Sequence, residues 1–443
     1  MAPALRAFVA SLFAGYAAAR QCQTLSIPVD ISSRQGVFRE VPVEDNLDVS
    51  GFSTRFTQFQ FNYSAELFTG FQTLQKSIEI SAQYCTPDAG SNGIIQVLSH
   101  GIAFDKTYWD LSYDNYNYSY VNVAIDAGYS TLAIDRFGIG NSTHGDPFNE
   151  IQANSEVEAL NEVTKKLRAG SIAEINCTYE KVIHVGHSFG SVQSYWLSVL
   201  YPNNTDGVVL TGFSAAGQFL PYIVAGWNLH SARLNQPFRF GNASATTVRS
   251  LAQKYGVEGD IVPGLTSILN DLDVDVNTDE VWNYVGSTEI NDLINGYNQS
   301  LFQYNYPSGY FANSDLTALQ YSFLFPGQYD VGLAVAGEKT KQPVTAGELL
   351  TIGNAPGPSL FTGPVLVLTG QHDVPFCGGN CYGVLPDSNA TSIPAGAVAA
   401  FPSASAFEAY IQPNAGHGLN FHYNATAGYQ VVQDFLARNG LSA

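Results

Sequence analysis

Short apolar runs separated by helix-length segments recur from residue 94 onward in this chain of 443 residues. Apolar runs that alternate with helices are typical of a parallel sheet whose strands are joined by crossover helices. The pattern predicts strands at residues 94–98, 131–134, 182–185, 208–211, 365–369 and 407–411. It predicts helices over residues 151–167, 188–200 and 425–437.

Residues 24–90 have a different pattern, in which apolar and polar residues alternate, as between Lys76 and Tyr84. A period of two is typical of strands with one buried face. We therefore expect this segment to form an antiparallel lead-in of strands before the parallel sheet.

The alternation of strands and helices fails between residues 217 and 362, a stretch too long for a loop in a compact domain. The stretch is rich in aromatic residues, and Gly and Pro cluster at its end. We expect a large, mainly helical cap, inserted between the sixth and seventh strands of the sheet. Most of its aromatic residues would pack the cap itself, and some would line a cleft beneath it. The predicted units are a sheet domain in two parts, residues 20–216 and 363–443, and a cap over 217–362.

The N-terminus combines Arg6, an apolar run over Ala7–Ala19 and a final run of three alanines. These are the three regions of a secretory signal peptide, which we expect over residues 1–19, with cleavage near Ala19. The run is too short for a stable membrane anchor, and no later stretch is long and apolar enough to be one. The sequence predicts a secreted protein.

Charge and glycosylation motifs agree with export. The formal net charge is −19, which argues against binding to nucleic acid or anionic membranes, since both need a basic surface. Asn-x-Ser/Thr sequons, the acceptor motif for N-glycans, occur at Asn62, Asn117, Asn141, Asn176, Asn203, Asn242, Asn298, Asn389 and Asn424.

The chain has 5 cysteines, and an odd number in an exported protein leaves one unpaired. Cys377 and Cys381 close a tight Gly-Gly-Asn loop and form the first expected disulfide. Cys22 and Cys85 would then tie the N-terminal arm to an early strand, which leaves Cys177 free. A metal site at Cys377 and Cys381 is the alternative, although no second ligand pair has suitable spacing.

The most informative motif is Gly186-His-Ser-Phe-Gly190, which directly follows the apolar run at 182–185. A Gly-x-Ser-x-Gly turn between a strand and a helix lifts the serine hydroxyl out of the sheet on a sharp bend. A neutral hydroxyl is a poor nucleophile, so Ser188 needs a base and a group that orients this base.

Reactive groups in open sheets gather at the carboxyl ends of the strands. Asp373 follows the strand at 365–369, and His417, between two glycines, follows the strand at 407–411. The chain order Ser188, Asp373, His417 is the Ser…Asp/Glu…His order of α/β-hydrolases. After the strand at 208–211 the chain has Thr211-Gly-Phe-Ser214, without a carboxylate, so Asp373 is the one candidate acid.

The chain resembles the α/β-hydrolase superfamily, in its capped branch with a serine nucleophile, and secreted fungal proteins of this superfamily. The resemblance rests on five segments: His100-Gly101 with Trp109 downstream, Asp135-Arg-Phe-Gly-Ile-Gly-Asn-Ser142, Gly186-His-Ser-Phe-Gly190, Gly370-Gln-His-Asp373 and Gly416-His417. It implies an α/β-hydrolase fold, with a mostly parallel central sheet flanked by helices.

The resemblance also implies roles. Ser188 would be the nucleophile, His417 the general base and then acid, and Asp373 the group that orients His417. The backbone N–H groups of Phe189 and Ile102 would form the oxyanion hole. Many lipases have a longer run of glycines after this histidine than the chain has after His100. Epoxide hydrolases use an Asp as the nucleophile, so a serine at position 188 disfavours that chemistry.

The remaining candidates have simpler explanations. We expect His184 to lie in the core, His187 to point away from the reacting hydroxyl, and His100 to support the oxyanion loop. For His422 we expect helix capping or exposure, for Asp135 an anchor of the Gly138–Gly140 turn, and for Asp105 and Lys106 surface placement.

Together these observations predict an exported serine hydrolase of carboxylic esters, of the esterase, lactonase or lipase kind. It would act on a small, partly apolar ester-like molecule, through an acyl-enzyme on Ser188, without a cofactor. The alternatives on the same three residues are amide or peptide hydrolysis, C–C bond hydrolysis, and acyl transfer or cyclisation. A ligand-binding protein without catalysis is the alternative outside enzymes, and it predicts a broken triad. The sequence leaves the oligomeric state open.

Overall fold

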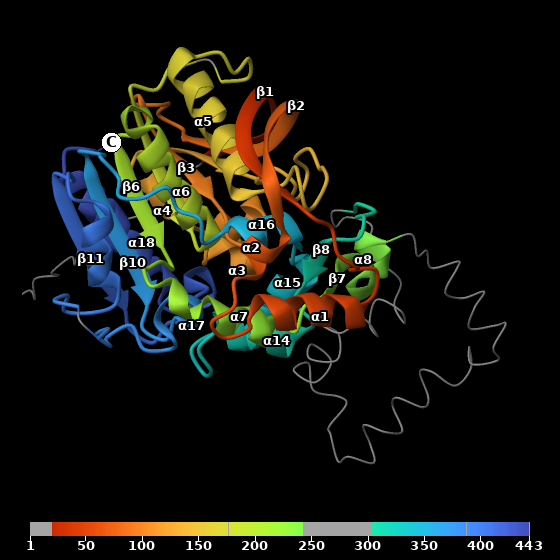
Figure 1. Ribbon diagram of the computed structural model, residues 1–443. Helices are drawn as coiled ribbons and strands as arrows, with labels where there is room; N and C mark the ends of the chain where they lie inside the picture. The colour runs from red at the N-terminus through yellow and green to blue at the C-terminus, as the bar shows by residue number, and fades with distance from the viewer. Residues whose placement is uncertain (1–19, 176, 242–302, 387, 443) are drawn as a thin grey trace, which may run out of the picture.

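The computed structural model describes residues 20–175, 177–241, 303–386 and 388–442 (Figure 1). The predicted signal peptide lies outside the described residues, as do the middle of the predicted cap and the sequons at Asn176, Asn242 and Asn298.

The centre of the molecule is an eight-stranded sheet with the strand order β1-β2-β4-β3-β5-β6-β10-β11. Its strands are β1 (Arg20–Phe38), β2 (Phe68–Pro87), β3 (Ile94–Ser99), β4 (Ser130–Ile134), β5 (Lys181–His187), β6 (Gly207–Thr211), β10 (Pro364–Gly370) and β11 (Ala406–Gln412). The pairs from β4 to β11 are parallel, whereas β1 and β2 join antiparallel at one edge. All six predicted parallel strands are present, and so is the antiparallel lead-in.

Helices cover both faces of the sheet, and every residue of β3, β4, β6 and β10 is therefore buried. Helix α5 (Ala153–Ala169) packs against α6 (Phe189–Leu200), and α4 (Tyr120–Asp126) packs against α18 (Ala425–Arg438). The three predicted helices are thus found as α5, α6 and α18. Shorter elements on the loops are η1 (Lys106–Trp109), α3 (Tyr113–Tyr116), η2 (Pro202–Asn204), α17 (Val374–Cys377), η4 (Pro394–Ala400) and η5 (Leu419–Phe421).

Two helices that the sequence pattern missed lie between β1 and β2. They are α1 (Asn46–Phe56) and α2 (Tyr63–Leu67). The side chain of Asp45 accepts hydrogen bonds from the first turn of α1, and Asn62 does the same for α2, so both helices begin at a polar N-cap.

The segment between β6 and β10 carries the predicted cap. Its described elements are η3 (Gly217–Phe219), α7 (Leu220–Trp227), β7 (His230–Ser231), α8 (Ala232–Asn235), α9 (Pro237–Phe240), β8 (Tyr310–Ala312), α14 (Leu316–Phe323), α15 (Val331–Thr340), β9 (Val344–Thr345) and α16 (Ala346–Thr351). Besides helices, it contains a small antiparallel sheet of β7, β8 and β9. Helices α1, α7, α14 and α17 lie along one edge of the molecule, next to the strand ends (Figure 1). Buried residues of α14, α15 and α16 join the main hydrophobic core, and the boundaries at 217 and 362 stay a prediction.

The strand order, the parallel centre and the helical layers make this an α/β-hydrolase fold, as predicted. Within the described ranges, no helix is long and apolar enough to cross a membrane.

Candidate active site

Ser188 lies on a strained turn between β5 and α6. Its backbone angles are φ 55° and ψ −117°, a conformation that non-glycine residues rarely adopt and that clusters at functional sites. The two glycines of the motif allow the close approach of neighbouring backbone. A Cβ on Gly186 would lie 2.3 Å from the carbonyl oxygen of Gly190, and one on Gly190 would lie 2.1 Å from that of Ser99.

Ser188, His417 and Asp373 form a continuous chain of hydrogen bonds. The Oγ of Ser188 lies 2.8 Å from Nε2 of His417, and Nδ1 of His417 lies 2.6 Å from Oδ2 of Asp373. Because the ionised carboxylate only accepts, Nδ1 carries the proton, and Nε2 is left to accept from the serine hydroxyl. The side chains come from the carboxyl ends of β5, β10 and β11, as the open-sheet rule predicts.

The site is nearly closed to solvent. Asp373 is 0% exposed, His417 1% and Ser188 9%. A hydrogen bond in such surroundings is stronger electrostatically than one in water. The structure thus brings together the three residues that the sequence proposed for catalysis.

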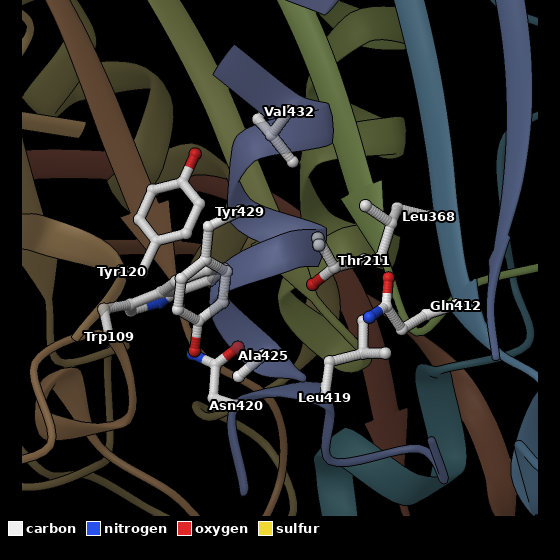
Figure 2. Close-up of a pocket in the computed structure, with 11 residues that line it drawn as sticks. Trp109, Tyr120, Thr211, Leu368, Gln412, Leu419, Asn420, Ala425, Tyr429 and Val432 are labelled. Carbon is white, nitrogen blue, oxygen red and sulfur yellow. The ribbon is translucent and has the colours of Figure 1, made fainter. Parts of the chain in front are cut away.

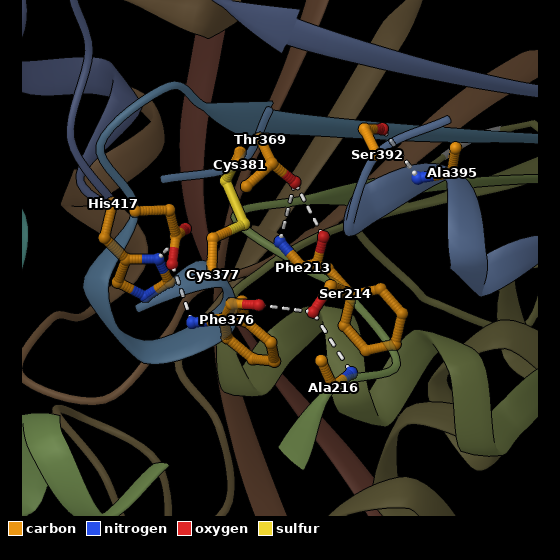
Figure 3. The surroundings of a disulfide bond; sticks show 11 residues. Phe213, Ser214, Ala216, Thr369, Phe376, Cys377, Cys381, Ser392, Ala395 and His417 are labelled. Atoms are coloured by element: carbon orange, nitrogen blue, oxygen red, sulfur yellow. Dashed lines mark hydrogen bonds and ion pairs between the residues drawn. A yellow bond between two sulfur atoms is a disulfide. The ribbon is translucent and has the colours of Figure 1, made fainter. Parts of the chain in front are cut away.

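A short helix orients Asp373. The residue is the N-cap of α17, and its Oδ1 accepts from the backbone N–H of Phe376 at 2.8 Å. The sulfur atoms of Cys377 and Cys381 are 2.03 Å apart, at the end of the same helix. Figure 3 shows this disulfide beside His417 and the ring of Phe376. The disulfide therefore closes the loop that follows the helix whose N-cap is Asp373.

Aromatic rings surround His417. The rings of Phe323 and Phe376 lie 5.6 Å from its imidazole, and the ring of His187 lies 4.9 Å away. Phe323 belongs to α14, so the segment between β6 and β10 contributes directly to the site. Gly212, at φ +54°, leaves space for the imidazole of His417, because a Cβ at this position would lie only 2.9 Å from its Nδ1.

The two proposed oxyanion donors flank the serine. Phe189 is the first residue of α6, and Ile102 follows Gly101, whose Cβ would lie 2.7 Å from Cβ of Ser188. Among the described residues, neither N–H donates a hydrogen bond. Both donors are therefore unpaired next to Ser188, and their role in the oxyanion hole stays a prediction.

His100 is buried beside this loop in one tautomer. Its Nδ1–H donates to the carbonyl of Gly101 at 2.8 Å, and its Nε2 accepts from the N–H of Arg136 at 3.1 Å. Burial, and then the charge of Arg136, hold the pKa of His100 well below 6.5. A neutral His100 thus connects the loop of Ile102 with the loop after β4.

His187 also stays neutral. Thr211 Oγ1 donates to the carbonyl of Gly186, so it accepts from Nδ1 of His187 at 3.2 Å. Burial, followed by repulsion from His417 and His100, holds the pKa of His187 well below 6.5. His184 is buried in β5 as expected.

The expectation for His422 holds only in part, because the residue is the C-cap of η5 but is not exposed. The residue is 0% exposed, and its Nε2 accepts from the N–H of Gly416 at 2.9 Å and of Phe325 at 3.0 Å. Its Nδ1–H donates to the carbonyl of Gly418 at 3.0 Å. His422 therefore holds both ends of the short loop that carries His417, and burial lowers its pKa to about 4.

Sequence reasoning also missed a buried ionic cluster beneath the turn. Arg136 forms ion pairs with Glu156 of α5 and Glu348 of α16, and all three side chains are at most 1% exposed. The guanidinium lies 4.8 Å from the ring of Phe189. Burial raises the pKa of Glu156 well above its usual range against the attraction of Arg136. The cluster links the turn of Ser188 to the segment between β6 and β10.

Asp135 and Lys106 differ in part from expectation. Asp135 accepts from the N–H of Asn141 at 3.0 Å, consistent with an anchor of the glycine turn. Lys106, expected at the surface, is 12% exposed in its side chain and pairs with Asp135 at 2.6 Å.

A narrow cavity lies between α18 and the ends of β6, β10 and β11 (Figure 2). Its volume is about 10 Å³, which suffices for about one water molecule. Trp109 and Gln412 are among the residues that line it. Nε1 of Trp109 and Oε1 of Gln412 have no hydrogen-bond partner in the described part of the chain. Neither Ser188 nor His417 lines the cavity, so it is not the place of a substrate.

The second predicted cysteine pair also lies at bonding distance, since the sulfur atoms of Cys22 and Cys85 are 2.06 Å apart. Cys177 is free. The described sequons with exposed asparagines are Asn62, Asn117, Asn141, Asn203 and Asn389. Asn424 is half-buried, and its Nδ2 donates to the carbonyl of Pro413, which makes it a poor acceptor for a glycan.

Comparison with known proteins finds only distant structural similarity. No family model matches the sequence, and no curated protein matches it. A thermophilic esterase from Thermogutta terrifontis has a TM-score of 0.39 at 15% identity, over 83% of this chain and 95% of its own. An epoxide hydrolase from Vigna radiata has a TM-score of 0.43 at 14% identity, over 82% and 95%. An α/β hydrolase fold protein from Chitinophaga pinensis has a TM-score of 0.40 at 11% identity, over 80% and 92%. Likeness at this level does not bear on the reaction.

Proposed function

We propose that this protein hydrolyses carboxylic esters through an acyl-enzyme on Ser188. The observation that carries the proposal is the chain from Ser188 through His417 to Asp373, with distances of 2.8 and 2.6 Å, on a strained strand-to-helix turn. A serine, a base and an orienting acid in this arrangement are the parts of nucleophilic acyl transfer.

In the first half of the reaction, Oγ of Ser188 attacks the ester carbonyl carbon while its proton passes to Nε2 of His417. The carbonyl oxygen becomes an oxyanion between the N–H groups of Phe189 and Ile102. The C–O bond to the alcohol then breaks, and the alcohol leaves with the proton of His417.

In the second half, a water molecule attacks the acyl-enzyme and gives a proton to His417. The acid is released, and the proton returns to Oγ of Ser188. Throughout, Asp373 holds Nδ1–H of His417 and stabilises the imidazolium that forms in each half. No step requires a cofactor.

The surroundings of His417 favour a small, partly apolar substrate. Phe323 and Phe376 lie against the imidazole, and Phe104 contacts Phe323 with ring centroids 4.8 Å apart. Sites for small molecules are mostly lined by apolar and aromatic side chains with a few polar groups.

The test is turnover of a panel of p-nitrophenyl esters, lactones and peptides by the wild type and by Ser188→Ala. We expect ester turnover by the wild type and a loss of at least about 10³-fold in the variant, with an unchanged circular dichroism spectrum. Turnover of peptides alone would transfer the proposal to amide hydrolysis. A folded wild type that acts on none of these substrates, and that no fluorophosphonate labels, would contradict the proposal in favour of ligand binding without catalysis.

We also propose that the protein is exported. The apolar N-terminus, the two cysteine pairs at bonding distance and the exposed sequons support this. Expression of the full chain in a eukaryotic secretory host should release a protein that begins near residue 20 and loses mass with an N-glycosidase. Retention inside the cell with an intact N-terminus would contradict the proposal.

A further inference from the structure

The loop that carries Ile102 has an unusual backbone. It runs from the end of β3 to η1, and Ala103, directly after Ile102, has a φ of 71°. This region of backbone space is costly for a residue with a Cβ and persists only where the surroundings hold it. The direction of the Ile102 N–H therefore depends on what holds this loop.

The sheet domain holds the two ends of the loop. At the first end, the N–H of Arg136 donates to Nε2 of His100 at 3.1 Å. At the other end, the N–H of Lys106 donates to Oδ1 of Asp135 at 2.9 Å. These contacts leave the middle of the loop, with Ile102 and Ala103, between two fixed points.

Gln342 holds the middle of the loop from the other side. Its backbone N–H donates to the carbonyl of Ala103 at 3.1 Å, and its Nε2 donates to Oδ2 of Asp105 at 3.0 Å. Gln342 is 1% exposed and lies in the segment between β6 and β10, after α15. One residue thus makes hydrogen bonds to two points of the loop just past Ile102.

Gln342 is itself firmly placed. Nη1 of Arg239 donates to the carbonyls of Lys339 and Lys341 at 2.8 and 3.0 Å. Nζ of Lys341 pairs with Glu338 and donates to the carbonyl of Asn313 at 2.8 Å. Arg239, Lys341 and Glu338 are each at most 2% exposed, so buried charges fix the backbone just before Gln342.

We propose that Gln342 is a positioning residue of the oxyanion hole. By holding Ala103 and Asp105 it fixes the direction of the Ile102 N–H, opposite the Phe189 N–H, where the oxyanion forms. The proposal rests on the proposed function, since it assigns Gln342 to the same acyl-transfer site. It means that the segment between β6 and β10 completes the catalytic geometry as well as covering the site.

The test compares Gln342→Leu with a matched control, Gln433→Leu. Leucine keeps the backbone N–H and the bulk but removes the bond to Asp105. Gln433 is also buried, but its partners are Gln96 and Tyr120, away from the loop. For each protein we would measure kcat and KM with a p-nitrophenyl ester, per site titrated with a fluorophosphonate, and the Ki of a trifluoromethyl ketone that forms a tetrahedral adduct on serine.

We expect Gln342→Leu to lower kcat about 10- to 100-fold, because a small misplacement of a catalytic group costs this much. KM should stay nearly constant, and Ki of the ketone should rise in parallel with the loss of kcat/KM. Gln433→Leu should keep kcat, whatever its thermal midpoint. A Gln342→Leu enzyme with wild-type kcat per titrated site and wild-type Ki would overturn the proposal.

Variants of the other partner keep the test decisive if Gln342→Leu does not fold. Asp105→Leu removes the same hydrogen bond and also the bonds that Asp105 Oδ1 accepts from the N–H and hydroxyl of Thr107. Asp105→Asn keeps an acceptor for Nε2 of Gln342 and for Thr107. We expect a loss of kcat in the first and near-wild-type kcat in the second, and equal kcat in both would overturn the proposal. Failure of the proposed function is a separate result, in which the wild type neither turns over esters nor labels at Ser188.

Discussion

His422 makes the stability of this protein sensitive to acid in a way that can be calculated from the structure. Its Nε2 accepts from the N–H groups of Gly416 and Phe325, and only a neutral imidazole can accept. Burial lowers its pKa from 6.5 to about 4 in the folded protein. In the unfolded chain the same side chain takes up a proton as the pH falls through about 6.5.

Between these two values the unfolded state binds more protons than the folded state, so the free energy of unfolding falls as the pH falls. The contribution is complete above about pH 6.5 and is lost at about 1.4 kcal/mol for each pH unit below it. It amounts to about 2.5 kcal/mol by about pH 4.5.

The assay is urea unfolding of the wild type and of His422→Gln at several values between about pH 7 and about pH 4.5. We expect the wild type to be the more stable protein at neutral pH, because Gln replaces only part of the hydrogen bonding. The difference should then close by about 2.5 kcal/mol toward the acid end. Gln433→Leu, a change without a titrating group, should differ from the wild type by the same amount at every pH. A difference between wild type and His422→Gln that does not depend on pH would show that His422 does not cause the acid sensitivity.

Three further variants test the turn of Ser188, the role of Asp373 and the buried cluster of Arg136. Gly101→Ala should lower kcat by about 10²-fold or more, because its Cβ would lie 2.7 Å from Cβ of Ser188. Gly51→Ala, with open space around it, should keep kcat. Equal kcat in both variants would contradict the close packing at the turn. Asp373→Asn should fold normally and lower kcat by about 10⁴-fold, since the amide favours the wrong tautomer of His417. The measurements are steady-state kinetics and a circular dichroism spectrum, and a much smaller loss of kcat would contradict the role of Asp373. Arg136→Met should lower the free energy of unfolding by about 3–5 kcal/mol, because it leaves two buried carboxylates unpaired. Arg438→Met, whose partner Glu408 is exposed, should change the free energy of unfolding by less than about 1 kcal/mol. Similar urea midpoints for these two variants would contradict the buried cluster.

The parallel strands were predictable from the sequence for a physical reason. Strands such as β6 and β10 are buried on both faces, so each appears as an unbroken apolar run. Helices α1 and α2 were not predictable in the same way, because they lie within a segment whose alternating pattern indicates strands. The strands β7, β8 and β9 have two or three residues each, which is too few for any periodicity.

Some residues of the candidate site were predictable from the sequence, and others were not. Ser188, Asp373 and His417 each follow a strand that the sequence reveals, and the carboxyl ends of parallel strands meet at one edge of the sheet, so their proximity was predictable. His422 and Gln342 carry no such signal. A histidine near a helix start and a glutamine before a proline are ordinary in sequence, and their roles arise only from contacts with the loops at Gly416 and Ala103.

The most direct test that Ser188 is the nucleophile is mass spectrometry of the protein after reaction with a fluorophosphonate. We predict one adduct per chain, on the peptide that contains Ser188, formed in parallel with the loss of ester turnover and absent from Ser188→Ala. A fully inhibited enzyme with the adduct on another residue, or an active enzyme that never forms an adduct on Ser188, would contradict it.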